Sequence, residues 1–218
     1  MIQVEGVTKS YPTSTGRQYI FRDLSFSIPE KSNIALIGRN GSGKSTLMRL
    51  IGGIDVPDKG KITTNNTISW PVGLTGGFQG SLTGRQNVKF VGRIYGAGYH
   101  RLREIVRYVE DFAEIGQYFD EPVRTYSSGM RTRLAFALSL AFDFDYYLVD
   151  EVMSVGDAHF RKKATDAMLE RIGQANLILV THSMGQVRDL CDKVLLLQSG
   201  KVTIFSDVDA GISAYNQS

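Results

Sequence analysis

Short apolar runs alternate along the chain with stretches in which apolar residues recur every three or four positions. Residues 34–37, 146–149 and 177–180 are continuously apolar, which is typical of strands buried on both faces of a helix-covered sheet. Strands are predicted at 2–4, 19–28, 33–37, 146–149, 177–180, 194–197 and 202–205, and helices at 44–51, 85–95, 102–112, 128–142, 158–172 and 184–191. This alternation predicts one α/β domain over residues 1–218.

The pattern changes between about residues 73 and 122, where eight glycines interrupt mostly helical sequence and no buried-strand run occurs. We interpret this segment as a helical subdomain inserted into the sheet domain. Residues 207–218 resemble a short closing helix, for which Asp207 is a candidate cap.

Composition narrows the class of protein. Hydrophobic residues make up 42% and charged residues 22% of the chain, which excludes a disordered or coiled-coil protein. The net charge of +3 is too small to indicate nucleic acid. The single cysteine, Cys191, predicts no internal disulfide, and no histidine or cysteine pair has zinc-ligand spacing. No apolar run approaches the roughly 20 residues that span a bilayer.

The strongest chemical signal is the segment from Gly38 to Ser45, Gly-Arg-Asn-Gly-Ser-Gly-Lys-Ser. It matches the phosphate-loop pattern G-x-x-x-x-G-K-[ST], and it lies between a predicted strand and a predicted helix, as such a loop requires. Lys44 is expected to reach the β- and γ-phosphates, and the Ser45 hydroxyl to coordinate Mg²⁺. The alternative is a simple glycine turn. The remaining phosphate-binding candidates are Gly38, Asn40, Gly41, Ser42, Gly43 and Thr46.

A second chemical signal is the acidic pair Asp150 and Glu151, which directly follows the apolar run 146–149. The carboxyl end of a central strand is where nucleotide-binding α/β sheets place their ligands. Asp150 can hold Mg²⁺, and Glu151 can polarise an attacking water. Taken alone, the pair is more often a helix cap or the start of a turn.

Together these motifs resemble the nucleotide-binding subunit of an ATP-binding cassette (ABC) transporter, over essentially the whole chain. Tyr-Ser-Ser-Gly-Met at 126–130 lies where the family has Leu-Ser-Gly-Gly-Gln, and only Ser127 and Gly129 match. With Ser128 they would still form an anion site at a helix start, although a serine-capped helix is the alternative. Asp157 matches the D-loop aspartate, and His182 matches the switch histidine that contacts the γ-phosphate.

Two further positions match the family less specifically. Tyr11 stands where the family stacks an aromatic ring on adenine, and core packing is the alternative. Gln79 is the candidate Q-loop glutamine that contacts the metal. It lies only three residues before Leu82, closer than the usual family spacing, so both readings of Gln79 stay open.

The departures from the family pattern resemble the branch that exports cell-surface polysaccharides. Asp-Glu-Val-Met-Ser-Val-Gly-Asp at 150–157, with a chain that stops at Ser218, is most similar to the capsular polysaccharide export ATPases of Gram-negative bacteria. O-antigen and teichoic acid export ATPases of the same branch are the alternatives.

The resemblance implies a P-loop nucleotide-binding fold with a mostly parallel central sheet, an antiparallel N-terminal β-subdomain and an inserted helical subdomain. It implies ATP and Mg²⁺, a homodimer with composite ATP sites, an integral membrane permease and envelope-spanning export proteins. The expected location is the cytoplasmic face of the bacterial inner membrane, with no nucleic-acid partner.

Two other classes remain as alternatives. A soluble ABC ATPase that acts on nucleic acid or ribosomes would use basic clusters such as 101–107 and 161–163, which on helices are more often solvated faces. A P-loop kinase would explain Lys44 but not the later motifs.

Overall fold

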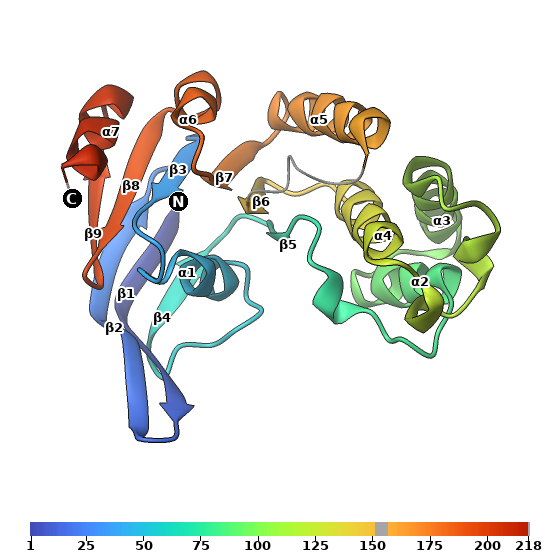
Figure 1. The fold of residues 1–218 in the computed structure, drawn as a ribbon, viewed down its shortest axis with the longest axis horizontal. Coiled ribbons are helices and arrows are strands. Elements are labelled where there is room, and N and C mark those ends of the chain that lie inside the picture. Colours follow the sequence, from blue (N-terminus) through green and yellow to red (C-terminus); the bar gives the residue numbers. More distant parts are fainter. Residues whose placement is uncertain (151–156, 218) are drawn as a thin grey trace. The chain divides into compact units, whose positions relative to one another are not determined.

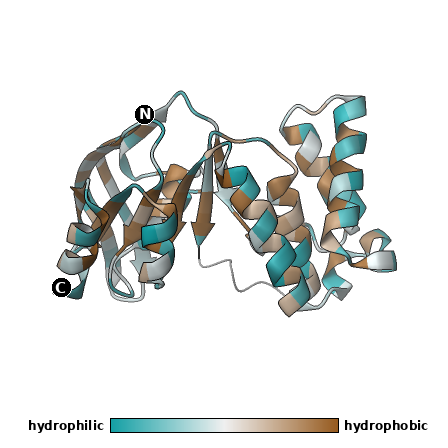
Figure 2. Cartoon of the chain, turned by 90° about the horizontal axis from the view of Figure 1, so that it is seen from above, coloured by the Kyte–Doolittle hydropathy of each residue, from teal (hydrophilic) through white to brown (hydrophobic). Residues whose placement is uncertain are grey.

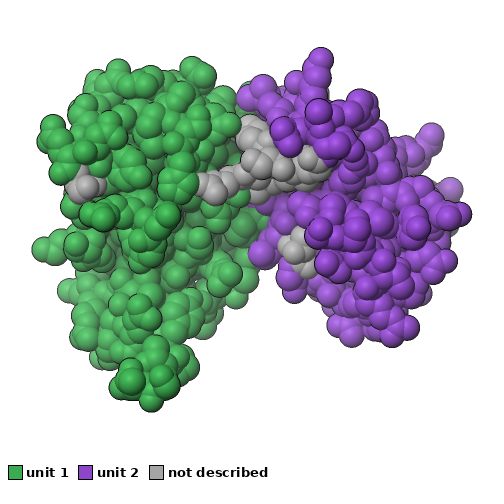
Figure 3. All heavy atoms as spheres, viewed as in Figure 1, with its two compact units in different colours: residues 1–71, 144–151, 172–218 green, residues 72–143, 152–171 purple. Residues whose placement is uncertain are grey.

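The computed structural model describes residues 1–150 and 157–217 of the 218-residue chain. The chain forms two compact units (Figure 3). Residues 1–71, 144–151 and 172–218 make up the first unit, and residues 72–143 and 152–171 make up the second. The chain therefore leaves the first unit twice and returns to it twice.

The first unit contains a six-stranded sheet with the strand order β5-β6-β7-β3-β8-β9 (Figure 1). Neighbouring strands are parallel, except that β8 and β9 form an antiparallel pair. Side chains on both faces of β3, β6, β7 and β8 are buried, which explains their unbroken apolar runs. The strands are β3 (Ile34–Ile37), β5 (Ile68–Pro71), β6 (Tyr146–Asp150), β7 (Asn176–Val180), β8 (Lys193–Gln198) and β9 (Lys201–Phe205).

A three-stranded antiparallel sheet, ordered β2-β1-β4, completes the strands of the first unit. β1 (Ile2–Thr13) pairs with β2 (Gly16–Ile28) from Ile2 opposite Ile28 to Thr13 opposite Gly16. β4 (Lys59–Thr64) was not predicted from the sequence. It is almost entirely exposed and carries one half-buried apolar side chain, Ile62, so it lacks the alternation that identifies a strand.

Among the described residues, the first unit has three helices: α1 (Lys44–Ile51), α6 (Met184–Leu190) and α7 (Val208–Asn216). The side chains of Leu47, Met48 and Leu50 on α1 are buried in a single apolar cluster. That cluster draws on both sheets, with Ile2 from one and Leu36 from the other among its members. The α1 helix that follows the phosphate-loop motif is thus fixed in the core of the unit. Each fully buried apolar side chain stabilises the folded state by roughly 2 kcal/mol.

The second unit is helical and larger than the 73–122 segment interpreted as the insertion, because α4 and most of α5 also belong to it. Rings of Phe112, Phe136 and Phe160 from three different helices pack with centroids 5.8–6.3 Å apart. Figure 2 shows polar and apolar residues alternating around these helices. The elements are η1 (Thr75–Gly77), α2 (Gly84–Ile94), α3 (Tyr99–Ala113), η2 (Gly116–Asp120), η3 (Val123–Thr125), α4 (Ser128–Leu140) and α5 (Ala158–Ile172).

The α4 helix is buried on all sides in its second half. Every residue from Leu134 to Leu140 is buried, including Ser139, whose hydroxyl donates to the carbonyl of Ala135 at 2.9 Å. None of the helices described in residues 1–150 and 157–217 is long and apolar enough to cross a membrane.

Candidate functional site

The phosphate-loop motif connects β3 to α1, as the sequence predicted. Two of its glycines are required by the surrounding structure. Gly43 has a φ of 103°, and a Cβ there would meet Ile20 Cγ2 at 2.6 Å. A Cβ on Gly38 would overlap the backbone carbonyl of Leu197 on β8. The loop is therefore held against β2 and β8 at a distance that only glycine allows.

Polar groups inside the loop are arranged around a space that suits an anion. The Lys44 ammonium donates to the carbonyls of Gly38 at 2.7 Å and Arg39 at 3.0 Å. Ser42 Oγ is the one buried side-chain polar atom without a hydrogen-bond partner among the described residues. An unsatisfied buried hydroxyl is costly, and a phosphate oxygen would satisfy it. The loop therefore fits a nucleotide phosphate.

The end of β6 brings the predicted acidic residue to this loop. Ser45 Oγ lies 3.5 Å from Asp150 Oδ2, although the two residues are 105 positions apart. Asp150 pairs in register with Val180 at the end of β7, two residues before His182. Parallel strands end at the same edge of a sheet, so three predicted residues converge there.

A cavity of ≈ 520 Å³ lies at this edge of the first unit. It gathers the predicted residues Asn40, Gly41, Gly43, Lys44, Ser45, Thr46, Asp150 and His182. Its wall also includes Gln18 and Ile20 of β2, which sequence reasoning missed. The pattern predicted a strand here, but no local signal indicated that the start of that strand faces the phosphate loop.

A hydroxyl and a single carboxylate suit Mg²⁺, which takes one or two carboxylates together with water and substrate phosphates. Ser45 and Asp150 supply this donor set. No group of three or more His, Cys, Asp or Glu side chains that could enclose a metal is present within residues 1–150 and 157–217. The site therefore fits an ion held jointly with a nucleotide.

Tyr11 does not belong to the cavity lining. Its hydroxyl donates to Asp55 Oδ2 at 2.7 Å, and the Lys9 ammonium donates to Asp55 Oδ1 at 2.6 Å. Burial alone would raise the pKa of the Asp55 carboxyl, but the hydrogen bonds from Lys9 and Tyr11 outweigh burial and lower it. Burial, followed by the bond to Asp55, raises the pKa of Tyr11. No pattern in the sequence indicates this network.

The predicted signature residues belong to the second unit. Ser127 caps α4, because its hydroxyl accepts from the backbone of Met130 at 3.2 Å. Ser127, Ser128 and Gly129 are all exposed. A Cβ on Gly129 would meet nothing closer than Ser127 Oγ at 3.9 Å, so packing within the chain does not explain this glycine.

Gln79 and Asp157 also lie in the second unit. The backbone of Gln79 donates to Asn87 Oδ1 at 2.8 Å, and its side-chain Nε2 donates to Ser81 Oγ at 3.3 Å. Asp157 accepts from the backbone of Phe160 at 2.9 Å and from Arg133 at 2.6 Å. The backbone bond and then the Arg133 charge lower the pKa of Asp157. Glu151, the predicted catalytic carboxylate, lies outside the described residues.

Comparison with known proteins decides the family. Residues 21–154 match the family described as ABC transporter. The chain belongs to the ABC transporter family. It is 55% identical over 216 residues to the Escherichia coli polysialic acid transport ATP-binding protein KpsT, covering 99% of this chain and 96% of the relative. It is 44% identical to the capsule polysaccharide export ATP-binding protein CtrD of Neisseria meningitidis, covering 99% of each.

The teichoic acid and O-antigen branches are more distant. The teichoic acids export protein TagH of Bacillus anthracis is 38% identical over 91% of this chain, which corresponds to 36% of that protein. A solved dimeric ATP-binding cassette bound to ADP and phosphate has the same fold, with a TM-score of 0.74 and 21% identity over 94% of this chain and 98% of that one. The predicted ABC fold and the resemblance to capsule export ATPases are confirmed.

Proposed function

We propose that this chain is the ATP-hydrolysing subunit that powers export of a capsular polysaccharide across the bacterial inner membrane together with a separate permease. The observation that carries the proposal is the 55% identity to a polysialic acid transport ATP-binding protein over nearly the full length of both chains. The cavity at the phosphate loop supports it, because its residues suit a nucleotide and a divalent ion.

In the proposed site the loop from Gly38 to Thr46 binds the phosphates of ATP. Lys44 exchanges its two loop carbonyls for phosphate oxygens, and the Ser42 hydroxyl gains the partner that it lacks. A bound Mg²⁺ would neutralise charge on the phosphates. Ser45 and Asp150 would hold it. The contact with the metal predicted for Gln79 stays a prediction.

Hydrolysis needs a residue that activates water and one that senses the terminal phosphate. We assign the first role to Glu151, which follows Asp150 in the sequence. We assign the second to His182, whose side chain is exposed at the cavity. Tyr11, held by Asp55, is the proposed adenine-stacking residue.

The working unit is proposed to be a homodimer in which each subunit completes the other's ATP site. The exposed start of α4 supports this, because Ser127, Ser128 and Gly129 lie exposed at a helix N-terminus, which suits an anion. Asp157 would line the same interface. Dimeric cassettes of this fold are known.

The remaining partners follow from the export role. The second unit, which contains the predicted insertion 73–122, is proposed to contact the permease, and envelope-spanning proteins would receive the polymer. The subunit would then act at the cytoplasmic face of the inner membrane.

Two variants test the proposal. Lys44→Ala should abolish ATP binding and ATPase activity of the purified protein, and cells that carry it should accumulate polymer in the cytoplasm. Glu151→Gln should still bind ATP but stop turnover and trap the dimer, which gel filtration would detect. Lys59→Ala, which removes an exposed cation on β4, is the control. Normal polymer export by Lys44→Ala cells would refute the proposal.

A further inference from the structure

A groove of ≈ 830 Å³ in the second unit lies between α2 and α3, outside every residue assigned above to ATP. Its wall carries five Lys or Arg side chains against two Glu. These cations are Arg85, Lys89 and Arg93 on α2, and Arg103 and Arg107 on α3. The excess of three positive charges equals the net charge of the whole chain.

The cations form regular rows. Arg85, Lys89 and Arg93 follow one another at intervals of four residues on α2, so they lie along one face, with successive side chains about 6 Å apart. Arg103 and Arg107 have the same spacing on α3. Two rows of like charge facing one groove repel each other and oppose folding. A ligand of opposite charge would relieve that repulsion.

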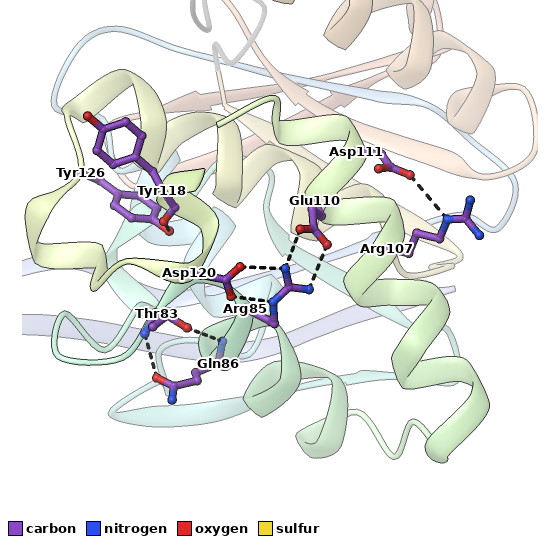
Figure 4. Close-up of polar contacts among 9 residues, drawn as sticks. All are labelled: Thr83, Arg85, Gln86, Arg107, Glu110, Asp111, Tyr118, Asp120 and Tyr126. Atoms are coloured by element: carbon purple, nitrogen blue, oxygen red, sulfur yellow. Dashed lines mark hydrogen bonds and ion pairs between the residues drawn. The ribbon is translucent and has the colours of Figure 1, made fainter. Parts of the chain in front are cut away.

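Part of this charge is compensated inside the protein. Arg85 donates to both oxygens of Glu110, at 2.9 and 2.5 Å, and to both oxygens of Asp120, at 2.7 and 3.0 Å (Figure 4). The hydrogen bonds that Arg85 donates to Asp120, and then those that it donates to Glu110, raise the pKa of its guanidinium. Arg107 has only a 3.8 Å contact with the exposed Asp111. Arg85 is thus a structural element of the groove.

The other three cations have no such partner. Among the described residues, neither Lys89 nor Arg93 makes a hydrogen bond or ion pair, and both are exposed. The Arg103 guanidinium lies 5.9 Å from the ring centre of Tyr99, and Glu104 pairs with Arg101 outside the groove at 3.4 Å. The groove therefore presents three cations that form no hydrogen bond or ion pair within the described residues, beside the ring of Tyr99, a residue that is 71% exposed.

We propose that this groove binds an anionic polysaccharide, a glycan chain that bears carboxylate or phosphate groups along its length. The inference rests on the proposed export function and names a contact between this subunit and its cargo. Lys89, Arg93 and Arg103 pair with successive charges of the polymer. The face of Tyr99 packs against the apolar C–H face of a sugar ring, while Arg103 beside it holds the adjacent charge.

The shape and chemistry of the groove distinguish this ligand from other anions. A bilayer surface is too broad to reach cations that line a concave wall. An acidic peptide would match the charges, but it has no need of an exposed aromatic ring beside them. A charged glycan uses both features.

The test measures binding to purified polysialic acid, a carboxylated glycan, by titration calorimetry at low and moderate salt. Binding should weaken as salt rises. The triple variant Lys89→Gln, Arg93→Gln, Arg103→Gln should bind at least about tenfold more weakly, with a smaller salt dependence. Tyr99→Ala should weaken binding without changing the salt dependence. Unchanged affinity in the triple variant would overturn the proposal.

A matched control separates the groove from general charge. Lys59→Gln, Lys162→Gln, Lys201→Gln removes three exposed cations outside the groove and should bind like the wild type. Neutral dextran should not bind. Equal binding of polyglutamate would reassign the groove to acidic peptides, and equal binding of phosphatidylglycerol vesicles would reassign it to the membrane; either result overturns the glycan assignment.

The test of polymer binding by the groove can be separated from the test of ATPase activity. The triple variant should keep the basal ATPase rate, and Lys44→Ala should keep polymer binding, because the groove shares no residue with the phosphate loop. Absence of polymer binding by the wild-type protein, with normal Lys44-dependent export, would refute only the groove. Export that does not require Lys44 would refute the proposed function itself.

Discussion

Ser45 Oγ at the start of α1 lies 3.5 Å from Asp150 Oδ2 at the end of β6. This spacing places a hydroxyl and a carboxylate where one divalent ion could contact both. The two residues come from separate motifs, and the parallel sheet brings them together.

We predict that Ser45→Ala and Asp150→Asn each lower Mg²⁺-dependent ATPase activity by about 100-fold. Ser45→Ala removes an oxygen ligand, and Asp150→Asn replaces a charged carboxylate by a neutral amide, so more Mg²⁺ should be needed for half-maximal rate. Titrating the ATPase rate against Mg²⁺ checks this. Asp145→Asn is the control, since Asp145 precedes β6 and bonds to Thr67 instead. An unchanged Mg²⁺ requirement in Asp150→Asn would contradict the assignment.

Gly43 combines a left-handed backbone with a close approach to β2, so replacing it should strain the fold. Gly43→Ala should lower the free energy of unfolding by about 1–3 kcal/mol. Urea unfolding of the purified protein measures this change. Gly98→Ala is the control, because Gly98 has a φ of −67° and a Cβ there meets nothing within 4 Å. If both variants unfold at the same urea concentration as the wild type, the loop is not tightly held.

The phosphate loop and the central strands could be predicted because their signals are local. The loop is a continuous motif, and an unbroken apolar run such as 34–37 directly indicates a buried strand. β4 and the Lys9–Asp55 pair could not be predicted. β4 is almost entirely exposed, and Lys9 meets Asp55 across 46 positions through contacts that no pattern encodes.

The basic groove also could not be predicted from the sequence. Arg103 and Arg107 were interpreted from the sequence as part of a solvated helix face, which an isolated row of cations usually is. Lys89 and Arg93 change that interpretation, because they belong to a different helix that lines the same groove. Only tertiary structure brings the two rows together.

The Lys9–Asp55 ion pair should contribute to stability in a pH-dependent way. The side chains are 8% and 23% exposed, so Asp55→Asn leaves a buried ammonium without its counter-charge. We expect it to lower the free energy of unfolding by about 3 kcal/mol at pH 7. A double-mutant cycle with Lys9→Met measures the coupling and should recover much of the loss.

The sign of the pH dependence follows from the lowered pKa of Asp55. The unfolded chain binds a proton at the ordinary value of about 3.9, whereas the folded chain resists protonation. The stabilisation is therefore complete above the unfolded value and is lost as the pH falls through the lower folded value. Urea unfolding from pH 7 to 3 should show a steeper loss for the wild type than for Asp55→Asn. Parallel curves would show that Asp55 has no linked proton.

The alkylation rate of Cys191 can be used to measure how much ATP binding stabilises the folded protein. Burial, with a smaller contribution from Asp192, raises the pKa of its thiol to about 12, and the side chain is 7% exposed. Because the thiolate is the reactive form, alkylation near pH 8 should be slow and should proceed through opening of the protein. ATP at 100 times its Kd stabilises the folded state by about 2.7 kcal/mol and should slow labelling about 100-fold. Lys44→Ala should remove that protection, whereas the rate in urea should be equal for both proteins. Rapid labelling of the native protein would show that Cys191 is accessible without opening.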